Sequence, residues 1–494
     1  MTVVRTVLFW ALAAALAAAH VVVAWDSLFV ARLWEDEAFN LTVPLNLLSG
    51  LGYSSDGALS GSEITPFDPR ISTGPTVLLP VAALLATGLD PVVAARLVPL
   101  AFWVLLLAGL GVLGRKLGGR WAALLAVAVP LGFDTTGGFS PIQGPADLLG
   151  EIPAAALLVW ALVVLPRRAW LAGLLVGLAV QAKFIAILAL PAFAVAIWAL
   201  SPGRRWARIG TTAKRSWLPL VLAGVPSLAV ELAALLSLGP AGYVTHLRNL
   251  WYFVATGGQK GARSTVAEKL ATLADAWFVP VWAVLLVALA GLALIVCGFL
   301  VERGRGRRAP GLVRATALAA AVGLAAFVGW WATAGHTPLW VRHPAVGVFA
   351  FVPVLGIVAV WGARRMLRRA HGAPAAAPAP TARSVLAVAL VAVVAAGAAA
   401  GALGHVRHAL EPRSETLTAQ RAAVEPIREW VAQTGTPWLA AQPWGAAVSA
   451  IVLSGAHVGL FDAPAMDGVP RLTGAACASE ALVEGTGYRV CPAP

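Results

Sequence analysis

Apolar stretches recur along most of this chain, and short clusters of arginine and lysine separate them. A helix needs roughly 20 apolar residues to cross the hydrocarbon core of a membrane, so few other folds would produce this pattern. Hydrophobic residues make up 59% of the 494 residues and charged residues only 12%, and the mean hydropathy is +0.81. These values exclude a soluble protein with a single core. The pattern predicts an all-α polytopic membrane protein.

The basic clusters indicate which helix ends face the cytoplasm. The formal net charge is +13, and the cations lie between apolar spans rather than among aromatic residues on a solvated face. This placement follows the positive-inside rule and argues against a nucleic-acid partner. The clusters expected on the cytoplasmic side are Arg115 to Arg120, Arg167 and Arg168, Arg204 to Arg215, Arg303 to Arg314, and Arg364 to Arg383.

About eleven transmembrane helices satisfy this alternation, with two of them forming a hairpin over 170–201. The other expected spans are 6–24, 92–113, 121–134, 148–166, 218–238, 277–300, 315–333, 344–363 and 384–403. The first span has the length of a signal peptide, but no small-residue cleavage site precedes Trp25 and Asp26, so we expect it to be retained. The prediction is a plasma (inner) membrane protein with a cytoplasmic amino terminus and an extracytoplasmic carboxyl terminus.

The chain is expected to have two domains. Residues 1–403 form the transmembrane domain, whose first external loop covers 25–91 and contains an interfacial helix over 75–88. Residues 404–494 change composition and predict a small extracytoplasmic α/β domain. Its expected elements are helix 416–433, strand 437–441, helix 444–454 and strand 457–462. Cys477 and Cys491 both lie there, and an oxidising exterior would let them pair.

Three consecutive carboxylates, Glu35, Asp36 and Glu37, follow the first span in a chain with few acids. At a membrane surface they are candidates for chemistry, although they also fit a solvated helix end or a pairing with Arg32. A second acidic pair precedes the span over 148–166: Asp147 and Glu151 are one helical turn apart and would share a face. The alternative is a charge pair favoured by the helix dipole.

Several cations lie on the external side, against the positive-inside bias. Lys183 falls between apolar segments and is either functional or snorkels to the interface. Arg342 and His343 precede a span and are candidates to bind a phosphate. Lys260 and Arg263 belong to the run GGQKGAR, whose backbone amides would suit a phosphate, although ordinary loop flexibility is the more common explanation of such a run.

The order of these features resembles the GT-C superfamily of polyprenyl-phosphate-sugar glycosyltransferases. The similarity covers roughly residues 1–365 and is closest to the branch of protein O-mannosyltransferases and the aminoarabinose transferase. The first-loop acids, the segments GEIPA (150–154) and QAKFIA (181–186), and RISTGPT, which begins at Arg70, carry the resemblance. Trp340-Val341-Arg342-His343-Pro344 stands where many members have an Arg-Tyr pair, so His343 is a departure.

The resemblance implies a reaction as well as a fold. Asp36 would be the base that takes the acceptor proton, with Glu37 orienting the acceptor or the base. The residues expected to bind the donor phosphate or substrate are Arg70, Asp147, Glu151, Lys183, Lys260, Arg263, Arg342 and His343. The expected partners are a polyprenyl-phosphate-linked sugar, a lipid, glycan or protein acceptor, and membrane lipids.

No cofactor or metal ligand is assigned, although some relatives use a divalent metal and others do not. The main alternative is a transporter or flippase of lipid-linked glycans, which should show repeat symmetry and polar residues near the bilayer midplane. Here the charges gather at one set of helix ends, and this favours an enzyme. A noncatalytic scaffold would explain the terminal domain but not the acidic cluster.

Overall fold

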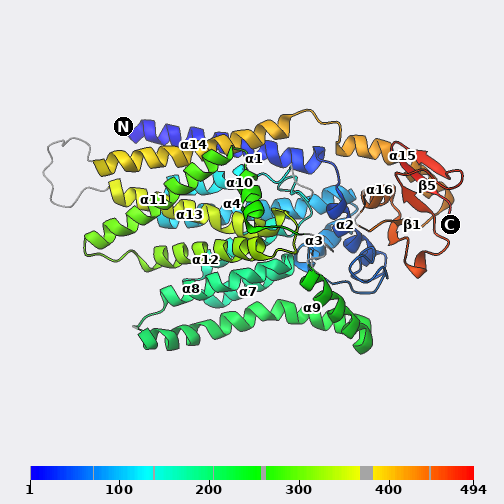
Figure 1. The fold of residues 1–494 in the computed structure, drawn as a ribbon, viewed down its shortest axis with the longest axis horizontal. Helices are drawn as coiled ribbons and strands as arrows, with labels where there is room; N and C mark the ends of the chain where they lie inside the picture. The colour runs from blue at the N-terminus through cyan, green and yellow to red at the C-terminus, as the bar shows by residue number, and fades with distance from the viewer. Residues whose placement is uncertain are drawn as a thin grey trace.

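The computed structural model describes residues 2–69, 72–136, 140–203, 205–256, 263–367, 382–443, 445 and 447–493. A long helical bundle carries a small mixed sheet at one end, and the amino terminus lies at the other end (Figure 1). We call these the sheet end and the N-terminal end. The bundle contains α1 (Thr2–Trp25), η1 (Asp26–Val30), α2 (Glu35–Leu48), α3 (Pro75–Leu85), α4 (Pro91–Gly118), α5 (Arg120–Ala128), η2 (Val129–Gly132), α6 (Glu151–Val164), α7 (Ala169–Ala182), η3 (Phe184–Ala189), α8 (Leu190–Leu200), α9 (Arg205–Thr256), α10 (Val266–Asp275), α11 (Val281–Gly304), α12 (Gly311–Thr333), α13 (Arg342–Leu367) and α14 (Ala382–Leu410).

Within the described residues, 7 helices are long and apolar enough to cross a membrane. These are the long helices α1, α4, α9, α11, α12, α13 and α14, and shorter apolar helices lie between them. The chain is therefore a multi-pass membrane protein. The count of about eleven spans stays a prediction, because the shorter helices do not meet this length.

Two of the short helices form the hairpin that was predicted over 170–201. α7 packs against α6 and α9, whereas α8 packs against α12, and Lys183 lies at the turn between them. α3 begins with Pro75 in its first turn and lies within the expected interfacial segment. Proline suits this position because the first helical residues have no intrahelical acceptor for their N–H groups.

The expected span 218–238 was too short. α9 runs from Arg205 to Thr256 and consists of two helices that meet at Gly239, where φ is +67°. Gly239 and Pro240 do break the helix, as their residue types suggest. However, proline also fits the first turn of a new helix, so 240–256 is helical rather than part of an external loop.

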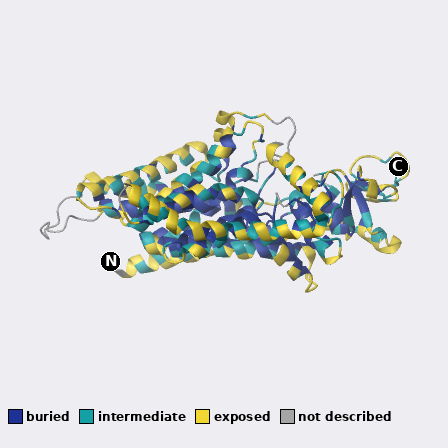
Figure 2. Cartoon of the chain, turned by 90° about the horizontal axis from the view of Figure 1, so that it is seen from below, coloured by how far each residue is buried: buried dark blue, intermediate teal, exposed yellow. Residues whose placement is uncertain are grey.

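The two ends of the bundle differ in charge. The α8–α9 and α11–α12 connections, which carry basic clusters, lie at the N-terminal end (Figure 1). Arg120 also belongs there, since its guanidinium lies 5.0 Å from the ring centroid of Phe9 in α1. The acidic start of α2 lies toward the sheet end. Buried residues fill the centre of the bundle, and exposed apolar residues cover its outside (Figure 2).

The C-terminal α/β unit begins with α15 (Leu417–Thr434) and contains a five-stranded sheet in the order β2-β1-β3-β5-β4. Its elements are β1 (Trp438–Ala441), α16 (Ala447–Ser454), β2 (His457–Leu460), η4 (Pro464–Met466), β3 (Arg471–Thr473), β4 (Val483–Gly485) and β5 (Tyr488–Cys491). β1 pairs in parallel with β2 and β3, whereas β5 is antiparallel to β3 and β4. The four predicted elements and the Cys477–Cys491 disulfide are confirmed.

Candidate active site

The three consecutive acids form the first turn of α2, which follows the extended residue Trp34. Carboxylates are favoured there because the helix N-terminus carries partial positive charge. Successive helical residues point about 100° apart, since a turn holds 3.6 residues. Asp36 and Glu37 therefore meet different partners, and the structure assigns each a different arginine.

Glu37 forms a sealed ion pair with Arg96 of α4. Nε of Arg96 donates to Oε1 of Glu37 at 2.7 Å, and Nη2 donates to Oε2 at 2.8 Å. The remaining Arg96 N–H groups donate to the carbonyls of Leu28, Ala31 and Arg32. Both side chains are 0% exposed. This pair ties α2, α4 and the segment before α2 together, and it leaves no room for a substrate at Glu37.

Asp36 joins a second cluster that is less enclosed. Arg342, at the start of α13, donates a hydrogen bond from Nη1 to Asp36 Oδ2, and the Asp36 side chain is 15% exposed. Glu151, the first residue of α6, lies 3.7 Å from Arg342 Nε and 2.9 Å from Lys183 Nζ. These contacts form one chain of alternating charges, which we call the Asp36 cluster. Its residues are Asp36, Arg342, Glu151 and Lys183.

Aromatic rings enclose the guanidinium of this cluster. Arg342 lies 5.6 Å from the ring centroid of Trp34 and 5.8 Å from that of Trp340. The His343 ring packs against Trp340 and Trp330, and its Nδ1 is buried. Trp34 and Trp340 hold Arg342 in place by cation–π attraction.

The expectation that Asp147 and Glu151 share a helical face is wrong. α6 begins at Glu151, so Asp147 lies in the preceding turn and points elsewhere. Its Oδ2 accepts from the backbone N–H of Gln143 at 2.5 Å. Burial raises the pKa of Asp147 well above its usual range, and the nearby negative charge of Glu37 raises it further. Asp147 therefore belongs with the Glu37–Arg96 pair.

Three further candidates, Arg70, Lys260 and Arg263, come from loops. Arg70 and Lys260 lie outside the described residues. Arg263 is exposed just before α10, and within the described part of the chain it forms no ion pair with the Asp36 cluster.

Arg96 is the important residue that the sequence analysis missed. It sits in the apolar run that forms α4, on the side where cations are disfavoured. The signal was present, because an ionisable residue inside an apolar span usually has a specific partner. Its partner is 59 positions away, however, and no local pattern identifies it.

An apolar cavity of about 710 Å³ lies within the bundle, and the four residues of the Asp36 cluster are not among those that line it. α11, α12, α13 and α14 contribute its lining, including Val348 and Val352 of α13. Val348 is six residues from Arg342, or about 9 Å along the helix at a rise of 1.5 Å per residue. The charged cluster at the helix ends and the apolar cavity are therefore separate features that share the helix α13. Among the described residues, no group of three or more His, Cys, Asp or Glu side chains is arranged to hold a metal ion.

The fold is that of the GT-C glycosyltransferases. The chain is similar to ArnT from Cupriavidus metallidurans, an aminoarabinose transferase. Against its apo structure the TM-score is 0.57 at 15% identity, covering 92% of this chain and 85% of that chain. Against the structure of ArnT bound to undecaprenyl phosphate, the TM-score is 0.53 at 14% identity, covering 93% and 86%. No protein-family model and no curated protein matches the sequence.

Proposed function

We propose that this protein is an integral membrane glycosyltransferase that transfers a sugar from a polyprenyl phosphate to a cell-envelope acceptor. The observation that carries the proposal is the Asp36 cluster, in which an accessible carboxylate touches the cation best placed for a phosphate. The fold supports it as well, since ArnT was solved with a bound polyprenyl phosphate.

In the proposed reaction, Asp36 takes the proton of an acceptor hydroxyl, and that oxygen bonds to the anomeric carbon of the donor sugar. The bond from this carbon to the phosphate oxygen breaks, and the polyprenyl phosphate leaves with the electron pair. A single displacement of this kind inverts the anomeric configuration. A positioned general base contributes about 10²- to 10⁴-fold to such a step.

The cations of the cluster act on the leaving group. Arg342 and Lys183 stabilise the negative charge that develops on the phosphate, since N–H donors in a water-poor site act strongly on such charge. When the donor phosphate pairs with Arg342, it replaces Asp36 there and releases this carboxylate to act as the base. Glu37 positions α2 through Arg96 and does not touch substrate. The apolar cavity lined by Val348 and Val352 of α13 is the proposed place for the isoprenoid chain of the donor.

The proposal includes an orientation. Residues 1–403 form the catalytic membrane domain in the plasma membrane, with a cytoplasmic amino terminus, and 404–494 form an extracytoplasmic domain. The basic residues at the N-terminal end of the bundle support this arrangement. The reaction then takes place on the extracytoplasmic face.

The test compares the purified wild type with Asp36→Asn in lipid, incubated with labelled polyprenyl-phosphate sugars and envelope extracts. We expect the wild type to transfer label from one donor, and the variant to lose transfer by about 100-fold or more. Glu63→Gln is the matched control, because Glu63 is an exposed carboxylate in the same external loop. Transfer that survives Asp36→Asn would rule out this base. A donor that crosses the bilayer without being consumed would favour a flippase.

A further inference from the structure

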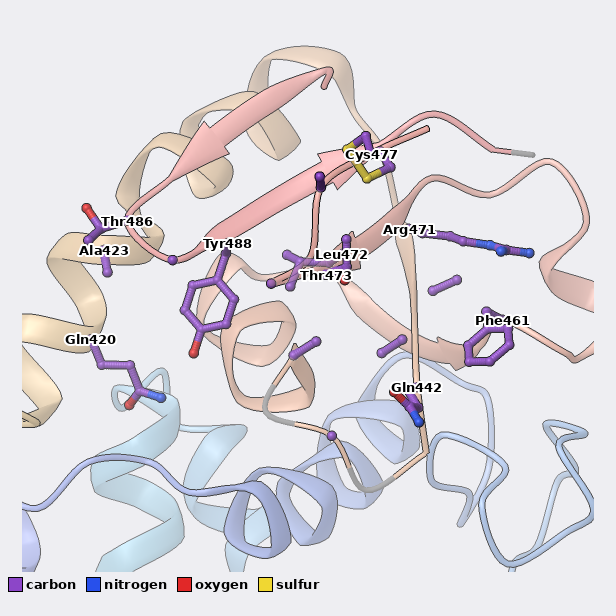
Figure 3. Close-up of a pocket in the computed structure, with 18 of the residues that line it drawn as sticks. Gln420, Ala423, Gln442, Phe461, Arg471, Leu472, Thr473, Cys477, Thr486 and Tyr488 are labelled. Carbon is purple, nitrogen blue, oxygen red and sulfur yellow. A yellow bond between two sulfur atoms is a disulfide. The ribbon is translucent and has the colours of Figure 1, made fainter. Parts of the chain in front are cut away.

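A second cleft, whose lining includes several polar side chains, lies at the sheet end of the molecule. It encloses about 870 Å³ between the C-terminal α/β unit and the segment that leads into α2 (Figure 3). Small residues such as Ala419, Ala441 and Gly474 leave it open. The polar and aromatic residues that line it include Arg32, Gln420, Gln442, Phe461, Arg471 and Tyr488.

This cleft is joined rigidly to the acidic start of α2. The Gln420 amide pairs with the backbone of Leu33 in both directions, each hydrogen bond at 2.9 Å. Ala31 forms an antiparallel bridge with Thr416. Arg32 lines the cleft and precedes Asp36 by four residues. Since consecutive Cα atoms are 3.8 Å apart, the Cα atoms of Arg32, in the cleft wall, and of Asp36 are at most about 15 Å apart.

The lining has the chemistry of a carbohydrate site. Tyr488 points from the sheet toward the N-terminal segments, and its hydroxyl can donate and accept hydrogen bonds (Figure 3). Arg471 lies 5.3 Å from the ring centroid of Phe461, and it has no carboxylate partner among the described residues. Phe461 is 40% exposed, so part of this aromatic residue is accessible to a ligand. Fixed polar groups beside aromatic faces suit a ligand rich in hydroxyls.

A peptide fits the cleft less well. Leu472 is the only large aliphatic side chain among the described lining residues, and it is 2% exposed, so an apolar anchor has no pocket.

We propose that this cleft binds the carbohydrate part of the acceptor and directs its reacting hydroxyl toward Asp36. The inference rests on the proposed glycosyltransferase function and specifies the acceptor class. The carbohydrate belongs either to a free polysaccharide or to the headgroup of a glycolipid. A short oligosaccharide chain spans the remaining distance between the cleft wall and α2.

Equilibrium binding tests the cleft without any catalysis. The full-length Asp36→Asn protein in lipid nanodiscs, with no donor present, is titrated with three fractions of envelope extract: protease-treated polysaccharide, glycolipid and protein. We expect the polysaccharide or the glycolipid fraction to bind, and this result identifies the source. Arg471→Ala and Tyr488→Phe, each added to that protein, should weaken binding by about tenfold or more. Because binding needs no transfer, this result is independent of whether Asp36 is the base.

The matched control is Arg489→Ala. Arg489 follows Tyr488 in β5, is not among the residues that line the cleft, and pairs with Glu484 at 2.9 Å. This variant should bind like the parent protein. In an active background, Arg471→Ala should raise KM for the acceptor, while slow hydrolysis of the donor by water stays unchanged. Binding of the protein fraction alone, no binding of any fraction, or equal binding by the Arg471 and Arg489 variants would overturn the proposal.

Discussion

Two neighbouring ion pairs on α2 perform different physical tasks. The Glu37–Arg96 pair is fully enclosed and uses most of its donors on backbone carbonyls, whereas the Asp36–Arg342 pair remains partly open. Both consist of an acid and an arginine, and the acids are adjacent in sequence. The difference teaches that enclosure, rather than residue type, separates a group that holds the site together from a group available to a substrate.

Breaking the enclosed pair should have the largest effect. Arg96→Ala leaves Glu37 as a buried, unpaired charge, and such losses cost about 3 to 5 kcal/mol. We expect a strong fall in apparent Tm and in the yield of folded protein in detergent. Arg421→Ala is the control, since it removes an exposed arginine paired with Asp90 at 2.7 Å, and such pairs contribute about 0 to 1 kcal/mol. Equal apparent Tm values for the two variants would remove the distinction between the pairs.

Arg342→Gln should affect activity more than folding. It removes the cation proposed to stabilise the leaving phosphate, and the loss of one such donor lowers kcat by about 10²- to 10³-fold. Transfer of labelled sugar measures kcat, and thermal unfolding measures the accompanying stability. Arg428→Gln on the exposed face of α15 serves as the control. Unchanged transfer by Arg342→Gln would place phosphate binding elsewhere.

A third test concerns the connection that holds the start of α2. Gln420→Ala removes both hydrogen bonds to Leu33 and one to Ser449. We expect a loss of about 1 to 2 kcal/mol, since a typical hydrogen bond contributes about 1 kcal/mol net. Apparent Tm and transfer should both fall moderately. A variant that loses transfer while keeping its apparent Tm would show that Gln420 acts on substrate instead.

The smallest effect should come from His457 of β2, which contacts Asn46 near the C-terminal end of α2. Its Nδ1 lies 3.0 Å from Asn46 Oδ1, and burial lowers the pKa of His457 below its usual value. The folded state therefore binds fewer protons than the unfolded chain, so stability falls as pH decreases below about 6.5. Apparent Tm measured from pH 8 to pH 5 should show this fall, and His457→Gln should reduce it. An identical profile in the variant would assign the pH dependence to other groups.

Local patterns predicted those features that depend on nearby residues. Hydropathy identified the long helices. An α/β residue pattern, with Pro and Gly between the elements, located the four elements from α15 to β2. The acidic first turn of α2 was visible because carboxylates are rare in this chain. Strands β3 to β5 were not predicted, since they are only 3, 3 and 4 residues long.

The contacts within the candidate site required the fold. Asp36 and Arg342 are 306 positions apart, and nothing near either residue shows that they meet. Asp147 was expected on a helix because the span was predicted to begin at residue 148, whereas α6 begins at Glu151. The backbone turn before that residue decides which way the carboxylate points.

The position of α13 has a consequence for the lipid environment. In the apolar stretch of α13, 78% of the residues are buried inside the protein, against 6% in the apolar stretch of the peripheral α9. Changes in bilayer thickness act on helices that contact lipid, and these helices tilt or shift first. Arg342 begins a helix that other helices surround. The charge that faces Asp36 is thereby insulated from membrane deformation, so membranes of different thickness should present the same geometry at this site.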